Sequence, residues 1–97
     1  MNIEMLYEEV KKIREDLHRI PEIAFDLPKT SEYVREKLIS YGYEPMPVAK
    51  TGWIAVLRGE EHASVAFRAD MDALEVEEKT DRAFSSEHPG RMHACGH

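Results

Sequence analysis

Apolar side chains recur between residues 6 and 20 at spacings of three and four residues. This period places them along one side of a helix, with charged residues such as Lys12 and Glu15 on the other side. The stripe consists of Leu6, Val10, Ile13, Leu17 and Ile20. Pro21 follows directly, and proline lacks the amide hydrogen that a continuing helix requires. The pattern therefore predicts an amphipathic helix that ends before Pro21.

A second stripe predicts another helix over residues 30–41, after a loop at residues 21–28. Its apolar positions are Val34, Leu38 and Tyr41. Thr30 or Ser31 can cap the first turn, because a hydroxyl oxygen there accepts an otherwise unbonded backbone N–H. Gly42 can take the left-handed conformation that commonly ends a helix.

The pattern then changes to short β-rich runs. Residues 43–48 include Pro45 and Pro47, which cannot donate to a β-ladder, so we expect this run at a sheet edge or only partly in a strand. Thr51 and Gly52 predict a turn.

Two further runs, residues 53–58 and 63–68, are joined by residues 59–62. We expect them to form a hairpin or to lie as neighbouring strands. Two helices followed by strands indicate an α/β fold, and 97 residues suffice for one small domain.

Composition narrows the classes of function. The net charge of −6 argues against nucleic-acid binding, which needs a clustered basic surface. The sequence contains no apolar run long enough for a membrane span, and the acids and lysines near residue 1 do not resemble a signal peptide. We therefore expect a cytoplasmic protein that binds neither nucleic acid nor membranes.

Two carboxylates follow the predicted strand at residues 63–68. Asp70 and Asp72 are two residues apart, so they share one face if the backbone stays extended. Acids at the carboxyl end of an α/β strand lie where such sheets place their active sites. The alternative is that these aspartates cap a following helix or bind water.

The last residues gather soft metal ligands. Cys95, the only cysteine, lies two residues from His97, with Gly96 between them and His93 nearby. A thiolate and an imidazole suit zinc, cobalt or manganese. A buried free cysteine flanked by surface histidines is the alternative. Because a catalytic zinc needs at least three protein ligands, the pair requires further donors from Asp70, Asp72, His93 or residues elsewhere.

Four segments in this order resemble a known family: LHRIPEIAFDLPKTSEYVREKL, TGWIAVLRG, VAFRADMDALEVEE and GRMHACGH. They are similar to the N-terminal part of the N-acyl-amino-acid amidohydrolases of the metal-dependent exopeptidase superfamily. Hippurate hydrolases, N-acetyldiaminopimelate deacetylases and plant auxin-conjugate hydrolases belong to this group. The resemblance implies that residues 1–97 form an incomplete N-terminal portion of a three-layer αβα catalytic domain, with two helices followed by strands of a mixed sheet.

The resemblance also implies a site with two divalent ions: manganese, zinc, cobalt or nickel. It makes Cys95 and His97 metal ligands and Asp72 the catalytic-site residue that orients a metal-binding side chain. Asp70 falls where wider relatives place a ligand histidine, so its role stays open, as does that of His93. The LHRIPE segment matches a family motif to which we assign a structural role, with His18 as a further site candidate.

The implied activity is hydrolysis of the amide bond of small N-acyl amino acids by a longer parent protein. The glutamate that would act as general base is absent, so we expect these 97 residues alone to be inactive. Alternatives are a metallo-aminopeptidase or dipeptidase relative and a non-catalytic binding or assembly module. Exposed sheet edges favour association into a homo-oligomer.

Overall fold

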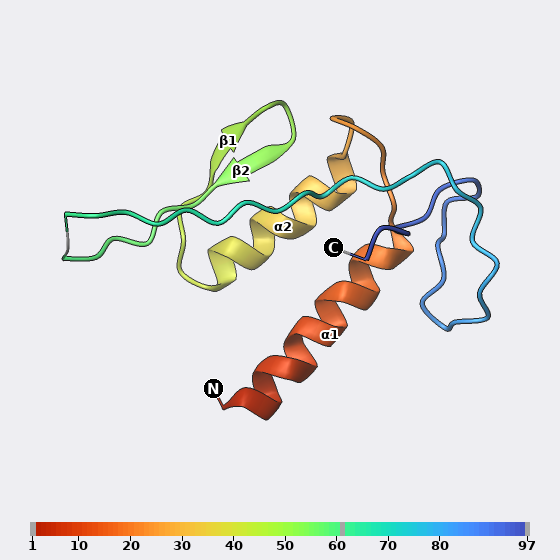
Figure 1. Ribbon diagram of the computed structural model, residues 1–97, viewed down its shortest axis with the longest axis horizontal. Coiled ribbons are helices and arrows are strands. Elements are labelled where there is room, and N and C mark those ends of the chain that lie inside the picture. Colours follow the sequence, from red (N-terminus) through yellow and green to blue (C-terminus); the bar gives the residue numbers. More distant parts are fainter. Residues whose placement is uncertain (1, 61, 97) are drawn as a thin grey trace.

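Two helices and a small antiparallel sheet make up the regular structure (Figure 1). The computed structural model describes residues 2–60 and 62–96. The elements are α1 (Ile3–Arg19), α2 (Pro28–Ser40), β1 (Met46–Val48) and β2 (Gly52–Ile54). The predicted α/β class is confirmed. None of the described helices is long and apolar enough to cross a membrane.

Helix α1 ends just before Pro21, as its sequence predicts. The Asn2 side chain caps its start by accepting the Met5 N–H at 2.8 Å. The predicted stripe is present, but Leu6 and Val10 remain 51% and 55% exposed. The N-terminal half of the stripe is therefore only partly covered by the described residues.

Helix α2 begins two residues earlier than predicted. Leu27 is its N-cap residue and Pro28 opens the first turn, where the fixed φ of proline suits a helix start. Thr30 and Ser31 lie inside the helix and are buried, so the predicted hydroxyl cap is wrong. Instead, the Glu22 carboxylate accepts the Thr30 N–H at 2.6 Å and the N–H of residue 29 at 3.2 Å.

The end of α2 follows the prediction. Gly42 has a φ of +90°. Its N–H donates to the Ile39 carbonyl at 2.9 Å, and the Tyr43 N–H donates to the Leu38 carbonyl at 3.0 Å. This pair of bonds is the usual way in which a left-handed glycine satisfies the last carbonyls of a helix.

Polar side chains join the two helices. The Tyr33 hydroxyl donates to Asp16 Oδ2 at 2.7 Å, and Lys37 Nζ lies 3.2 Å from Glu9 Oε1. Hydrogen bonds from Lys12 and Tyr33 lower the pKa of Asp16. The helices are thus joined by a hydrogen bond and an ion pair to carboxylates of α1.

Strands β1 and β2 form an antiparallel hairpin that pairs Met46 with Ile54. Its turn spans residues 49–51, with positive φ at Ala49 and Lys50, so of the predicted turn residues Thr51 and Gly52 it includes only Thr51. Gly52 is instead the first residue of β2, where a Cβ atom would lie 2.8 Å from the Val48 carbonyl oxygen. As predicted, the run that contains the two prolines is only partly strand.

The hairpin packs on α2 through Trp53. The indole N–H donates to the carbonyl and to the hydroxyl oxygen of Ser31, each at 2.9 Å. This contact fixes the small sheet against the first turns of the helix.

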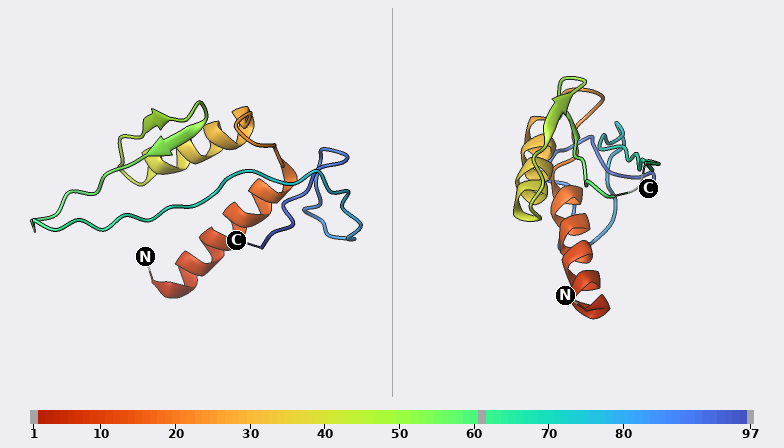
Figure 2. Two further views of the ribbon diagram at one scale, coloured as in Figure 1. Left: turned by 45° about the horizontal axis from the view of Figure 1, so that its top comes forward. Right: turned by 90° about the vertical axis from the view of Figure 1, so that its left-hand side faces the viewer.

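Residues 55–68, which we term the arm, differ from the predicted strand pairing. The runs 53–58 and 63–68 do not form a hairpin; only Trp53 and Ile54 join a strand, and the described part of the arm forms no β-ladder. Val65 and Phe67, in the second of these runs, are 84% and 97% exposed. The described part of the arm projects beyond the hairpin in Figure 1 and in the left view of Figure 2. A strand is buried only between neighbours, and no described segment lies against both of its faces.

The buried interior is small and largely polar. Its buried apolar side chains are Pro21, Leu27 and Ala73, of which Leu27 and Ala73 are each 4% exposed. The buried polar residues are His18, Glu22, Thr30 and Ser31. This interior lies where the end of α1, the start of α2 and the segment after the arm meet.

Candidate metal and catalytic site

A cavity of about 440 Å³ lies beside α1 and is lined by the predicted site residues. Asp70, Asp72, His93 and Cys95 all contribute to its wall. Leu17 of α1 contributes apolar surface from the opposite element. The structure therefore brings together two segments that are separated in sequence, as the predicted site requires.

Backbone pairing explains why these segments meet. Ala73 forms a parallel bridge with Ile23, and its N–H donates to the Glu22 carbonyl at 2.7 Å. Leu74 and Met92 form an antiparallel bridge with both N–H to carbonyl distances at 3.0 Å. Because these residues directly follow the aspartates and directly precede His93, the two bridges fix both segments at the end of α1.

The two aspartates face the cavity together, as their spacing predicts. Asp70 also pairs with Arg68, whose Nη2 lies 2.7 Å from Asp70 Oδ1, and the arginine is 86% exposed. No described helix begins after Asp72, so the alternative role as a helix cap is not supported.

His93 is half-buried and has an unsatisfied nitrogen. Its Nε2 is buried and has no hydrogen-bond partner among the described residues. Burial, and then the nearby His18, lower the pKa of His93, whereas the Asp72 carboxylate acts in the opposite direction. An imidazole near Asp72 with an unbonded ring nitrogen matches the kind of side chain that an aspartate orients in a metal site.

Cys95 is a free, exposed thiol on the wall of this cavity. His97 lies outside the described residues, so its predicted role as a ligand stays a prediction. Among residues 2–60 and 62–96, no group of three or more His, Cys, Asp or Glu side chains is arranged to hold a metal ion. The described residues thus form no complete donor set by themselves, and metal ligation by Cys95 stays a prediction.

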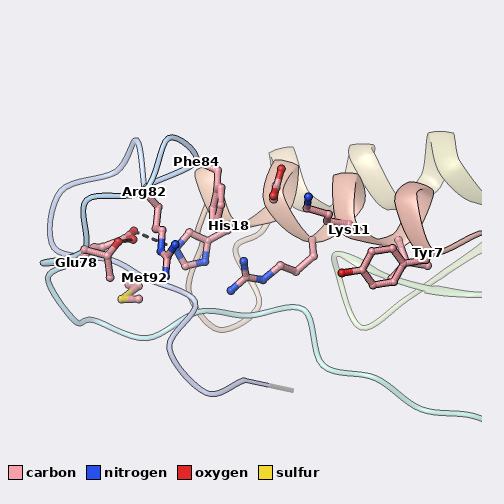
Figure 3. Close-up of a pocket in the computed structure, with 11 residues that line it drawn as sticks. Tyr7, Lys11, His18, Glu78, Arg82, Phe84 and Met92 are labelled. Carbon is pink, nitrogen blue, oxygen red and sulfur yellow. Dashed lines mark hydrogen bonds and ion pairs between the residues drawn. The ribbon is translucent and has the colours of Figure 1, made fainter. Parts of the chain in front are cut away.

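A second cavity, of about 850 Å³, adjoins the first and is bounded by α1 and the loop that follows Leu74 (Figure 3). His18 lines both cavities. Its Nε2 lies 3.0 Å from Glu78 Oε1, and both side chains are 6% exposed. Sequence reasoning missed Glu78, because it lies in a run of acids with no periodicity that would single it out.

Comparison with known proteins finds matches to one family of peptidases. Residues 66–97 match the sequence profile described as Peptidase family M20/M25/M40. These residues carry the signature of the M20 peptidases. The predicted resemblance to N-acyl-amino-acid amidohydrolases of the metal-dependent exopeptidase superfamily is confirmed, since relatives with those activities in their names match most of the chain.

Two curated relatives illustrate the match. The chain is 48% identical over 88 residues to an N-acetyldiaminopimelate deacetylase of Bacillus velezensis, which covers 88% of this chain and 24% of the relative. It is 42% identical over 91 residues to a hippurate hydrolase of Campylobacter jejuni, with 92% and 24% covered. The chain thus spans about a quarter of the length of these M20 relatives.

A solved structure agrees with the fold. The YXEP protein of Bacillus subtilis, described as a dinuclear metal-binding peptidase of the M20 family, superimposes with a TM-score of 0.90 at 37% identity. The match covers 98% of this chain and 27% of the other. The arrangement of helices, hairpin and arm is therefore similar to that of about a quarter of this M20 peptidase.

Proposed function

We propose that this sequence forms part of a longer metal-dependent amidohydrolase that cleaves the amide bond of N-acyl amino acids. One observation carries the proposal: Asp70, Asp72, His93 and Cys95 line one cavity at the end of α1. The names of the M20 relatives, which include deacetylases and a hippurate hydrolase, indicate the class of substrate.

The residues present fit part of a metal centre. Cys95 offers an exposed thiol, and a thiolate and a neutral imidazole both suit transition-metal ions. The buried, unbonded Nε2 of His93 adds a nitrogen that a further polar group would satisfy. Fewer than three grouped donors are found among residues 2–60 and 62–96, so the remaining ligands would come from His97 and from chain beyond these 97 residues.

Each residue of this chain has a proposed role. Cys95 would bind metal through its sulfur after losing the thiol proton, with His97 as its neighbouring ligand. Asp72 would accept a hydrogen bond from a metal-binding side chain and hold it in orientation. Asp70 would add negative charge beside them. When bound, two divalent ions would supply Lewis-acid polarisation of the scissile carbonyl and activation of a water molecule.

Several finer assignments belong to the same proposal. Manganese, zinc, cobalt and nickel are the candidate metals, because each is compatible with a mixed sulfur, nitrogen and oxygen donor set. We further propose that the longer protein forms a homo-oligomer and is located in the cytoplasm. These 97 residues by themselves should not hydrolyse amides, because within residues 2–60 and 62–96 no glutamate lines the cavity and no group of three ligands is arranged to hold a metal ion.

The test compares variants of the longer protein that contains this sequence. Cys95→Ala should lower both bound metal, measured by elemental analysis, and the hydrolysis of hippurate and N-acetyldiaminopimelate. Since loss of an outer-sphere partner already costs about 10–100-fold, loss of a ligand should cost at least about 100-fold in kcat/KM.

The matched control is Asp81→Asn, which removes a carboxylate from an exposed position on the loop after Leu74. It should leave metal content and activity unchanged. Retention of metal and activity by Cys95→Ala would contradict the proposal and would favour a non-catalytic binding module.

A further inference from the structure

Glu78 is the hydrogen-bonding centre of the loop at residues 75–91. Its Oε1 accepts the Ser86 N–H at 2.7 Å, and its Oε2 accepts the Thr80 hydroxyl. The side chain is 6% exposed. These hydrogen bonds, with a further one from His18, lower the pKa of Glu78 to about 2. The loop is therefore folded around a buried, ionised carboxylate.

His18 connects this carboxylate to α1. An ionised carboxylate can only accept hydrogen bonds, so His18 Nε2 carries the hydrogen that it donates to Glu78 at 3.0 Å. Phe84 lies edge-on to the imidazole with ring centres 5.7 Å apart, and Arg14 lies 5.1 Å above the Phe84 ring. Figure 3 shows His18 and Glu78 joined at one end of the larger cavity. The imidazole is held from two sides.

The loop touches α1 at a second point close by. The Glu87 N–H donates to the Arg19 carbonyl at 2.9 Å, one residue from His18. The base of the loop is the Leu74–Met92 bridge. Both ends of this bridge adjoin the candidate site, because Asp72 lies two residues before Leu74 and His93 lies one residue after Met92.

His18 also lies on the wall of the smaller cavity, which Asp72 and Cys95 share. The same side chain thus contacts the loop on one side and borders the candidate metal site on the other. A change in the His18–Glu78 pair would be transmitted to both segments of that site through the base of the loop.

We propose that His18 and Glu78 are positioning residues that fix the loop at residues 75–91 on α1, and so hold the Asp72 and Cys95 segments in the arrangement that binds metal. The inference rests on the proposed function, since it assigns these two residues a role in that metal site. Neither residue contacts the reacting atoms in this role; the pair acts through the loop and its base.

The experiment uses cobalt as a probe in the longer protein. Cobalt bound to a thiolate gives a charge-transfer absorption that reports the Cys95 sulfur in the metal's coordination sphere. Glu78→Gln should weaken cobalt binding by about 10-fold, the lower end of the cost of losing a group bonded directly to a ligand, because Glu78 acts only through the loop; it should also weaken this band at a fixed cobalt concentration. Glu75→Gln, an exposed neighbour, is the control and should bind cobalt normally.

A second pair of variants covers the case in which Glu78→Gln does not fold. His18→Gln keeps an N–H donor that can reach the Glu78 carboxylate, whereas His18→Leu removes it. Cobalt affinity should be nearly normal in His18→Gln and reduced by about 10-fold in His18→Leu, as in Glu78→Gln. Rescue by the donor-bearing variant is a result that loss of packing alone would not give.

The outcomes separate this inference from the proposed function. Weakened cobalt binding in Glu78→Gln and His18→Leu, with rescue in His18→Gln, would support the inference. Normal cobalt binding and a normal thiolate band in Glu78→Gln or His18→Leu would overturn it and leave the proposed function intact. A parent protein without any cobalt–thiolate band would overturn the proposed function, and the inference with it.

Discussion

The arm and the loop at residues 75–91 show opposite relations between sequence pattern and structure. The arm contains β-forming apolar residues, yet Phe67 is 97% exposed and the described part of the arm forms no ladder. The loop has no periodicity, yet hydrogen bonds to Glu78 and Glu77 and a bridge at its base hold it together. A strand needs a neighbour to bury its side chains, whereas this loop satisfies its own polar groups.

Substitution of Phe67 should give the largest difference in the free energy of unfolding between the short and the long protein. In the 97-residue chain, Phe67→Ala should change the free energy of unfolding by less than about 0.5 kcal/mol, because the ring is exposed. In the proposed longer protein, where a sheet would cover the arm, the same substitution should cost about 3–5 kcal/mol. Urea denaturation of both proteins measures the difference.

Phe84→Ala is the matched control, since its ring lies against His18 within the loop region. It should destabilise both proteins. Equal effects of Phe67→Ala in the short and the long protein would contradict the idea that the arm is a strand lacking neighbours.

A smaller effect is expected at the buried end of α2, on which the segment after the arm rests. Glu22→Ala removes the carboxylate that accepts the Thr30 N–H and leaves an uncapped helix start. The free energy of unfolding should fall by about 1–2 kcal/mol. Chemical denaturation followed by circular dichroism measures this change, with the exposed Glu36→Ala on the same helix as the control. Equal stability of the two variants would exclude a capping role for Glu22.

The contact between the helices should contribute less. Tyr33→Phe removes the hydroxyl that donates to Asp16 at 2.7 Å, and the cost should be about 1 kcal/mol. Tyr7→Phe, at an exposed position on α1, should have no measurable effect. A thermal or urea unfolding curve for each variant decides the point, and indistinguishable curves would show that the bond adds nothing to stability.

The smallest expected effect is a pH dependence of the stability that Glu78 gives to the loop. Hydrogen bonding lowers the pKa of Glu78 from its ordinary value of 4.5 to about 2 in the folded chain. The ionised form is favoured by folding, so this contribution to stability is complete above pH 4.5 and is lost as the pH falls toward 2. Urea unfolding at a series of pH values should show wild type and Glu78→Gln converging over this range.

The comparison with Glu78→Gln removes the contributions of Glu9 and Asp16, whose pKa values are also lowered and which titrate in both proteins. A difference between the two proteins that stays constant down to pH 2 would show that the Glu78 charge does not stabilise the loop.

Local signals in the sequence were sufficient to predict that both helices form and where each one ends. The spacing of Leu6 to Ile20, the stop at Pro21 and the left-handed Gly42 were read correctly because each acts within one or two turns of the chain. The start of α2 was missed because its cap is a side chain six residues before Pro28. Glu22 meets the helix only after the loop folds back, and no local pattern encodes that contact.

The site was only partly predictable for the same reason. The identity and spacing of Asp70, Asp72 and Cys95 indicated a shared site, and all three line one cavity. The role of His18 and Glu78 could not be read from the sequence, because the pair joins positions 60 residues apart. Metal ligation by His97 stays a prediction.

Trp53, the only tryptophan in the sequence, is bonded through its indole N–H to Ser31 at the start of α2. Its fluorescence therefore arises from one known place, the seam between the hairpin and the helix. Emission from this indole will follow separation of the hairpin without any attached dye, and far-ultraviolet signals from the helices can be recorded beside it to tell undocking from unfolding.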